Sequence, residues 1–132
     1  MIEREPNKEE AKILSYYYSQ ICRYVTCRND LRVPNPWLCK PIRVHESKTA
    51  NKVAWTDVFG VIHIMDYIIN SQDSFLFNAL VHEMVHVKQQ EKLSDRFIMR
   101  LPFVKNAYEA EAYAIGDQAE AWFRDIVNGE SK

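Results

Sequence analysis

Two different spacings of apolar residues follow one another along this chain, and each predicts its own kind of element. In the first quarter the spacing is helical, with apolar side chains at Leu14, Tyr17, Tyr18, Ile21 and Val25. Asn7 and Glu10 stand in the order of a capping box, which places the helix start directly after Asn7. Asn29-Asp30, followed by the proline-rich segment 34–36, indicates where this helix ends.

From residue 41 to residue 65 the pattern becomes that of strands. Residues 42–45 alternate between apolar and polar side chains, residues 53–55 alternate between larger and smaller ones, and residues 58–65 are mainly β-branched and apolar. We expect two or three antiparallel strands here, joined by turns near 47–51 and 56–57. Ser71-Gln72-Asp73 then supplies caps for a helix to about residue 92, and a last helix spans about 106–127, with Gly129 as its stop signal. This order predicts an α+β fold in a single domain covering residues 1–132.

Composition and charge narrow the classes of partner. The chain has 132 residues, 47% of them hydrophobic, which is enough for one core. Its 17 basic and 18 acidic residues nearly balance, so a nucleic-acid partner is not expected. No apolar run approaches the roughly 20 residues of a membrane span, and the charged start does not resemble a signal peptide. With three cysteines expected as buried free thiols, a cytoplasmic location is predicted.

The strongest chemical signal is His82-Glu83-Met84-Val85-His86, an HExxH in the helix predicted to end near residue 92. Residues four apart lie on one helix face, so both imidazoles can reach one metal ion. Glu83 is turned by about 100° around the axis and can instead reach a water molecule on that ion. Apolar residues surround the motif on every side, which predicts a buried central helix. The alternative is a pair of core histidines bonded to neighbours, with Glu83 in an ion pair.

A catalytic zinc ion needs three protein ligands and one open position, so a third ligand must come from elsewhere. Two remaining histidines, His45 and His63, lie in the strand region. The last helix offers Glu109 and Glu111, which are about 200° apart around its axis, so only one of them can face a given metal. Both glutamates flank the apolar stripe of that helix. Periodicity does not choose between them.

The motif and its surroundings resemble the gluzincins, the thermolysin-type zinc peptidases. His82–Val87 with Gln89 is similar to the HExxHVxQ helix of the small members, and residues 108–112 (Tyr-Glu-Ala-Glu-Ala) are similar to their YExEAD motif. The resemblance implies that Glu109 is the third zinc ligand. It also implies a zincin-like fold with an N-terminal helix, a small antiparallel or mixed sheet, the active-site helix and a C-terminal glutamate helix. Tyr113 departs from the pattern, because the family has there an aspartate that orients a ligating histidine.

The predicted function is that of a zinc-dependent metallopeptidase in which Glu83 is the general base. By resemblance, a peptide or protein substrate lies along an edge strand formed by residues 58–65. Tyr113 and His63 are candidates to stabilise the developing oxyanion, although packing roles are the alternative for both, and Gln89 is expected to form a hydrogen bond near the site. The competing hypothesis is a binding or assembly module that keeps the fold without proteolysis. The presence of Glu83 argues against it.

Overall fold

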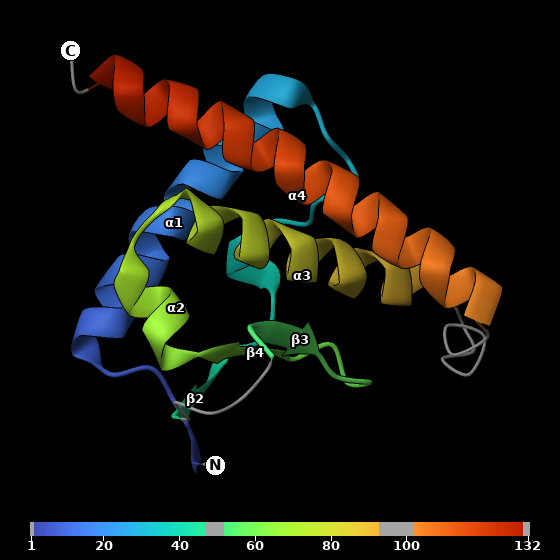
Figure 1. Cartoon of the computed structure of the whole chain (residues 1–132), viewed down its shortest axis with the longest axis horizontal. Coiled ribbons are helices and arrows are strands. Elements are labelled where there is room, and N and C mark those ends of the chain that lie inside the picture. The colour runs from blue at the N-terminus through green and yellow to red at the C-terminus, as the bar shows by residue number, and fades with distance from the viewer. Residues whose placement is uncertain (1, 47–51, 93–101, 131–132) are drawn as a thin grey trace.

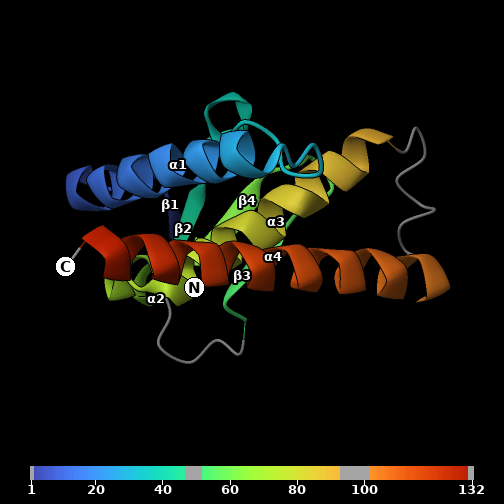
Figure 2. The ribbon, with the colours of Figure 1, turned by 90° about the horizontal axis from the view of Figure 1, so that it is seen from above.

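The computed structural model describes residues 2–46, 52–92 and 102–130, which form an α+β fold with helices on one side of a small sheet (Figure 1). The helices are α1 (Lys8–Arg28), α2 (Asp66–Ser71), α3 (Ser74–Lys92) and α4 (Pro102–Glu130), with a short 3-10 turn at Pro36–Leu38. Long helices α3 and α4 run in opposite directions beside each other (Figures 1 and 2). None of the described helices combines the length and apolar character that a membrane span requires.

Helix α1 begins and ends where its capping residues predict. Asn7 Oδ1 accepts from the Glu10 amide at 2.8 Å, and Glu10 Oε1 accepts from the Asn7 amide at 3.0 Å, which completes the predicted capping box. At the other end, Asn29 takes the left-handed conformation with φ 50°. Local side-chain chemistry therefore sets both ends of this helix.

Within the described residues the sheet has four strands, in the order β1-β2-β4-β3. They are β1 (Ile2–Arg4), β2 (Arg43–Glu46), β3 (Ala54–Thr56) and β4 (Ile62–Met65). The pairs β1–β2 and β3–β4 are antiparallel, whereas β2–β4 is parallel. The sheet is therefore mixed, which the expected antiparallel or mixed sheet includes. The parallel β2–β4 pair corrects the antiparallel strands expected between residues 41 and 65, and β1 is an additional strand that the sequence pattern did not indicate.

The prediction that residues 58–65 form an edge strand is also wrong. Residues 57–60 form a turn, in which Asp57 Oδ1 accepts from the amides of Phe59 and Val61, and Gly60 has φ 77°. The strand itself begins at Ile62 and lies between β2 and β3. All four β4 residues are buried, and an uninterrupted apolar run is typical of such a central strand. The edge next to the helices is β3 instead.

The remaining predicted elements are close to their observed places. Asp73 Oδ1 accepts from the Leu76 amide at 3.2 Å, so α3 has its predicted cap. Helix α4 begins at Pro102, earlier than expected, and it continues through Gly129, so the stop predicted there is wrong. Helix α2 was not predicted. The predicted turn at 47–51 lies outside the described residues.

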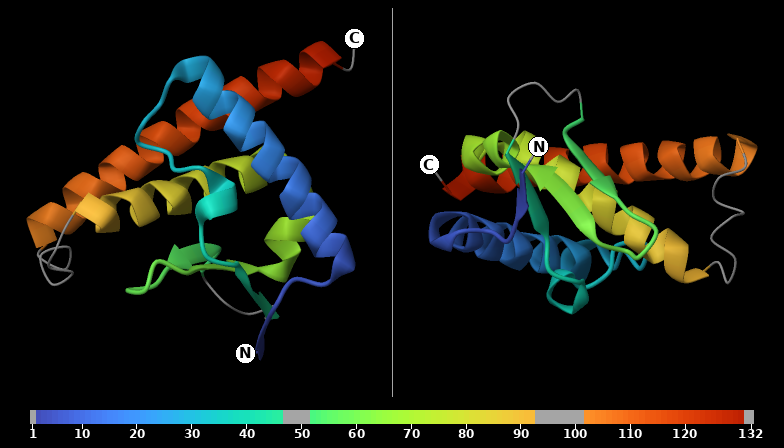
Figure 3. Two further views of the ribbon diagram at one scale, coloured as in Figure 1. Left: turned by 180° about the vertical axis from the view of Figure 1, so that it is seen from behind. Right: turned by 90° about the horizontal axis from the view of Figure 1, so that it is seen from below.

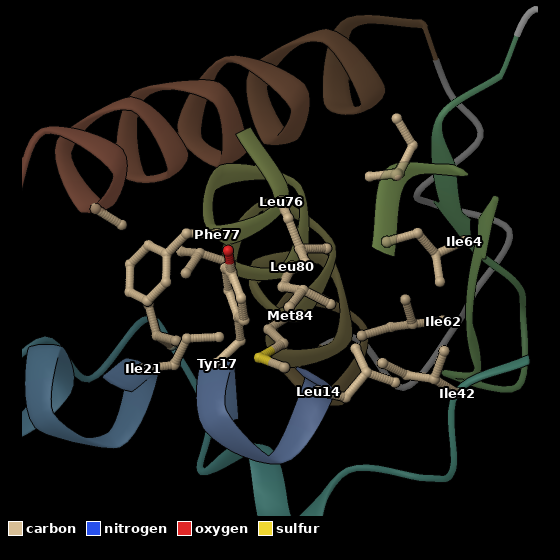
Figure 4. Close-up of a cluster of buried hydrophobic side chains, with 14 of the residues drawn as sticks. Leu14, Tyr17, Ile21, Ile42, Ile62, Ile64, Leu76, Phe77, Leu80 and Met84 are labelled. Atoms are coloured by element: carbon tan, nitrogen blue, oxygen red, sulfur yellow. The ribbon is translucent and has the colours of Figure 1, made fainter. Parts of the chain in front are cut away.

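One hydrophobic core fills the space between the sheet and the helices. Apolar side chains of α1 and α3 meet the inner face of β4, where Ile62 and Ile64 point toward them (Figure 4). Leu76, Phe77, Leu80 and Met84 make α3 the central helix, and all four are fully buried. The predicted apolar surroundings of the motif are therefore present, and they hold its helix rigidly in the middle of the fold.

Candidate metal centre

Three potential metal ligands converge where α3 and α4 face each other. His82 and His86 project from one side of α3, and Glu109 projects toward them from α4. Glu109 Oε1 lies 3.5 Å from His82 Nε2 and in closer contact with His86 Nε2. One ligand atom from each residue lies within 4.8 Å of the other two. The structure thus chooses Glu109 over Glu111 as the carboxylate that faces the two histidines.

Glu111 contacts Gln89 instead of the two histidines, and Gln89 in turn orients His86. Gln89 Nε2 donates to Glu111 Oε1 at 3.1 Å and to the Tyr108 carbonyl at 3.0 Å. These two bonds turn Gln89 Oε1 toward His86, where it accepts from Nδ1–H at 2.8 Å. The predicted hydrogen bond of Gln89 near the site is present. With Nδ1–H held by Gln89, Nε2 is the nitrogen that carries the lone pair in the neutral ring, and it points toward the other two ligands.

Glu83 lies beside the three ligands but is held by another element. The Thr56 hydroxyl of β3 donates to Glu83 Oε1 at 2.9 Å, while Oε2 lies 3.9 Å from His82 Nε2. Burial raises the pKa of Glu83 above its ordinary value. Thr56 was not identified from the sequence, since a threonine at a strand end carries no signal of this contact. One oxygen of Glu83 is therefore anchored and the other faces the ligand group.

His82 is buried at only 8% exposure, close to both His86 and Tyr113. Burial lowers the pKa of His82, because the low-dielectric surroundings disfavour the charged imidazolium. The neutral imidazole that a metal requires is thus favoured at this position. The Tyr113 ring packs edge-on against His82 with centroids 4.5 Å apart, and 59% of the tyrosine is exposed.

A groove of about 790 Å³ opens over the ligand group. One wall is the β3 segment from Lys52 to Thr56, and the others come from α3 and α4. Apolar and aromatic side chains dominate around the histidines, among them Phe75, Ala79 and Tyr108, with Lys105 at α4. The size suits several residues of an extended chain, and the ligand group forms part of its lining.

His63, a candidate for oxyanion stabilisation, is not among the residues that line this groove. Its ring bonds to His45 and to Asp57 and stacks on Trp55. These contacts fit the alternative of a structural histidine. His45, the other histidine of the strand region, is likewise separate from the ligand group on α3 and α4.

Comparison of the chain with protein-family models, with curated proteins and with solved structures returned no match. The residues and distances described above are therefore the basis for assigning a function.

Proposed function

We propose that this protein is a zinc-dependent metallopeptidase of zincin-like fold, with the ion held by His82, His86 and Glu109. The observation that carries the proposal is the contact between His86 Nε2 and Glu109 Oε1. Gln89 Oε1 accepts the Nδ1 proton of His86, so the lone pair of the neutral ring is on Nε2, which faces the carboxylate. A metal cation between this nitrogen and the carboxylate oxygen accounts for their close approach. Two imidazole nitrogens and one carboxylate oxygen are a donor set typical of catalytic zinc.

The residues around this donor set fit hydrolysis. Zinc, when bound, supplies Lewis-acid chemistry, which acidifies a water molecule and polarises a carbonyl group. Glu83 Oε2 is the proton acceptor, because Thr56 occupies Oε1. The same oxygen then returns the proton to the leaving amine. Tyr113, exposed beside His82, offers a hydroxyl donor to a substrate carbonyl in the groove.

The groove suits an extended peptide that pairs with β3. In the β3–β4 ladder, the Met65 amide donates to the Val53 carbonyl and the Asp57 amide donates to the Val61 carbonyl. Because every second residue of an antiparallel strand bonds to its partner strand, the backbone N–H and C=O of Trp55 also face β4. The backbone N–H and C=O groups of Ala54 and Thr56 therefore face away from β4, toward the groove. A peptide can add to these groups as a further strand. Strand β3 thus takes the role that the resemblance to gluzincins had given to residues 58–65.

The test is Glu83→Gln in zinc-loaded protein, with digestion of a peptide library as the assay. The substitution keeps the shape of the side chain but removes the proton acceptor, so turnover falls by about 10²–10⁴-fold while zinc content is unchanged. Glu91→Gln is the matched control, because Glu91 is exposed on the same helix. Full activity of Glu83→Gln would refute the assigned mechanism even if the metal is bound.

The competing function is a binding module, and Tyr113 is the observation that favours it. It stands where gluzincins have an orienting aspartate, and its exposed ring adds aromatic surface to the groove. A binding module predicts no cleavage by either the wild type or Glu83→Gln, with equal peptide affinity for both. A peptidase predicts cleavage by the wild type alone.

A further inference from the structure

A second group of metal-ligating side chains lies on the opposite face of the sheet. Glu3 of β1 is the cross-strand partner of His45 in β2, and Arg43 of β2 is the partner of His63 in β4. Since residues two apart on a strand share a face, Glu3, His45 and His63 all point to one side. One ligand atom from each lies within 4.8 Å of the other two. Among the described residues, no helix covers this face (Figure 3).

Although no helix covers this face, both histidines are buried, with 5% of His45 and 8% of His63 exposed. Trp55 shields them, since its ring stacks parallel on His63 at 5.2 Å and lies 4.6 Å from the ring of His45. Imidazoles shielded from water need partners for both ring nitrogens.

The hydrogen bonds do not satisfy that need. His63 Nε2–H donates to Asp57 Oδ2 at 2.8 Å, so the Nδ1 of a neutral His63 ring carries a lone pair. His45 Nε2 faces this lone pair at 2.8 Å, while His45 Nδ1 is buried without a partner among the described residues. If the His45 proton is on Nε2, Nδ1 is an unsatisfied acceptor. If the proton is on Nδ1, this N–H group is an unsatisfied donor, and the lone pairs of His45 Nε2 and His63 Nδ1 face each other.

We propose that Glu3, His45 and His63 form a second zinc site, which joins strands β1, β2 and β4. With the His45 proton on Nδ1, a cation between His45 Nε2 and His63 Nδ1 takes both opposed lone pairs as ligands, while the Nδ1–H of His45 stays a donor without a partner among the described residues. Asp57 holds the other nitrogen of His63, which is the carboxylate–histidine arrangement common around bound metals. Two nitrogens on a tetrahedral zinc ion stand about 3.3 Å apart, so the rings need to separate by only ~0.5 Å.

Glu3 completes the donor set and is itself held in place. Arg43 Nε donates to Glu3 Oε1 at 2.9 Å, which leaves Oε2 available as a ligand. A nitrogen-rich set with one carboxylate favours zinc over magnesium or calcium. The site lies apart from the groove and does not depend on the proposed peptidase activity.

The experiment uses the full chain and zinc alone, titrated against a competing chelator. His82→Ala/His86→Ala removes the site on α3 and leaves His45 and His63 as the last of the chain's four histidines. We expect two equivalents of zinc on the wild type and one on this double variant. The imidazole nitrogen resonances of both remaining histidines should shift when zinc is added. A folded double variant that binds no zinc, or binds it without these shifts, overturns the proposal.

Glu3→Gln is the second measurement, and it keeps the test decisive if the double variant does not fold. Glu3 is exposed, so its substitution leaves the fold intact but raises the dissociation constant of the second site at least about tenfold. Glu5→Gln, an exposed glutamate two residues along the chain, should change nothing. Equal zinc binding by these two variants overturns the proposal. If instead the site on α3 binds no zinc, the wild type binds a single equivalent of zinc, and Glu3→Gln weakens the binding of that equivalent. The outcomes that refute the two proposed sites are therefore different.

Discussion

The close approach of α3 and α4, which brings Glu109 to the two histidines, depends on Gly116. A Cβ atom at this position would overlap the Asn78 side-chain oxygen and lie 3.3 Å from both the Asn78 Cγ and its backbone oxygen. Asn78 is one helical turn before His82. Its side-chain amide donates to Asp117 at 3.0 Å and to Glu120 at 2.8 Å. Gly116→Ala therefore displaces the Asn78 side chain from these bonds and also crowds its backbone at the helix contact.

The size of the effect follows from three contributions. Overpacking at a tight helix contact costs about 1–3 kcal/mol. Loss of the two Asn78 hydrogen bonds adds about 0.5–1.5 kcal/mol each, with the smaller value for the exposed bond to Asp117. Alanine stabilises a helix by about 1 kcal/mol relative to glycine, which acts in the other direction. Together these contributions lead us to expect that Gly116→Ala lowers the free energy of unfolding by about 1–5 kcal/mol.

Urea denaturation measures this change as a shift of the midpoint at constant slope. Gly129→Ala is the matched control, because it lies in the same helix and nothing stands within 4 Å of a Cβ there. That variant should be as stable as the wild type or slightly more stable. Zinc affinity should fall in Gly116→Ala and not in Gly129→Ala, since only the first alters the spacing of α3 and α4. Equal or greater stability of Gly116→Ala would refute the reasoning.

Three further predictions concern the ligand set, the groove and the response to acid. Glu109→Ala should lose zinc far more than Glu111→Ala by elemental analysis, and the reverse order would mean that Glu111 is the ligand. Ala54→Pro removes an amide that faces the groove, so kcat/KM for peptides should fall about 2–10-fold with zinc retained; unchanged cleavage would exclude pairing along β3. The hydrogen bonds from Arg4 hold the pKa of Glu10 below its ordinary 4.5, so their stabilisation is complete above that pH and is lost as the pH falls through the lowered pKa. Glu10→Gln should therefore show a shallower loss of stability on acidification than the wild type, and parallel curves for the two proteins would contradict this assignment.

Local chemistry made several features predictable from the sequence. The caps of α1 involve Asn7 and Glu10, three residues apart, so their spacing alone indicates the helix start. The four-residue separation of His82 and His86 likewise places both on one face of α3, whatever surrounds the helix. Such features depend on neighbours within one turn.

Contacts between distant segments were beyond the same reasoning. Strand β1 has only three residues, two of them charged, and it exists because it pairs with β2, some 40 residues along the chain. The place of β4 in the middle of the sheet follows from a parallel pairing with β2 that no local pattern encodes. Its continuous apolar run was compatible with a central strand, but it could not show which strands stand on either side.

The sequence by itself determined the chemistry available to this protein: an HExxH on a central helix and two glutamates on the last helix. Only the tertiary structure decided which of those glutamates faces the histidines. Glu109 and Glu111 differ by about 200° around α4, and the rotation of that helix is set by its packing against α3, not by its own periodicity. The same holds for two other contacts between distant segments. Packing of β3 against α3 brings Thr56 to Glu83, and pairing of β2 with β4 brings His45 to His63.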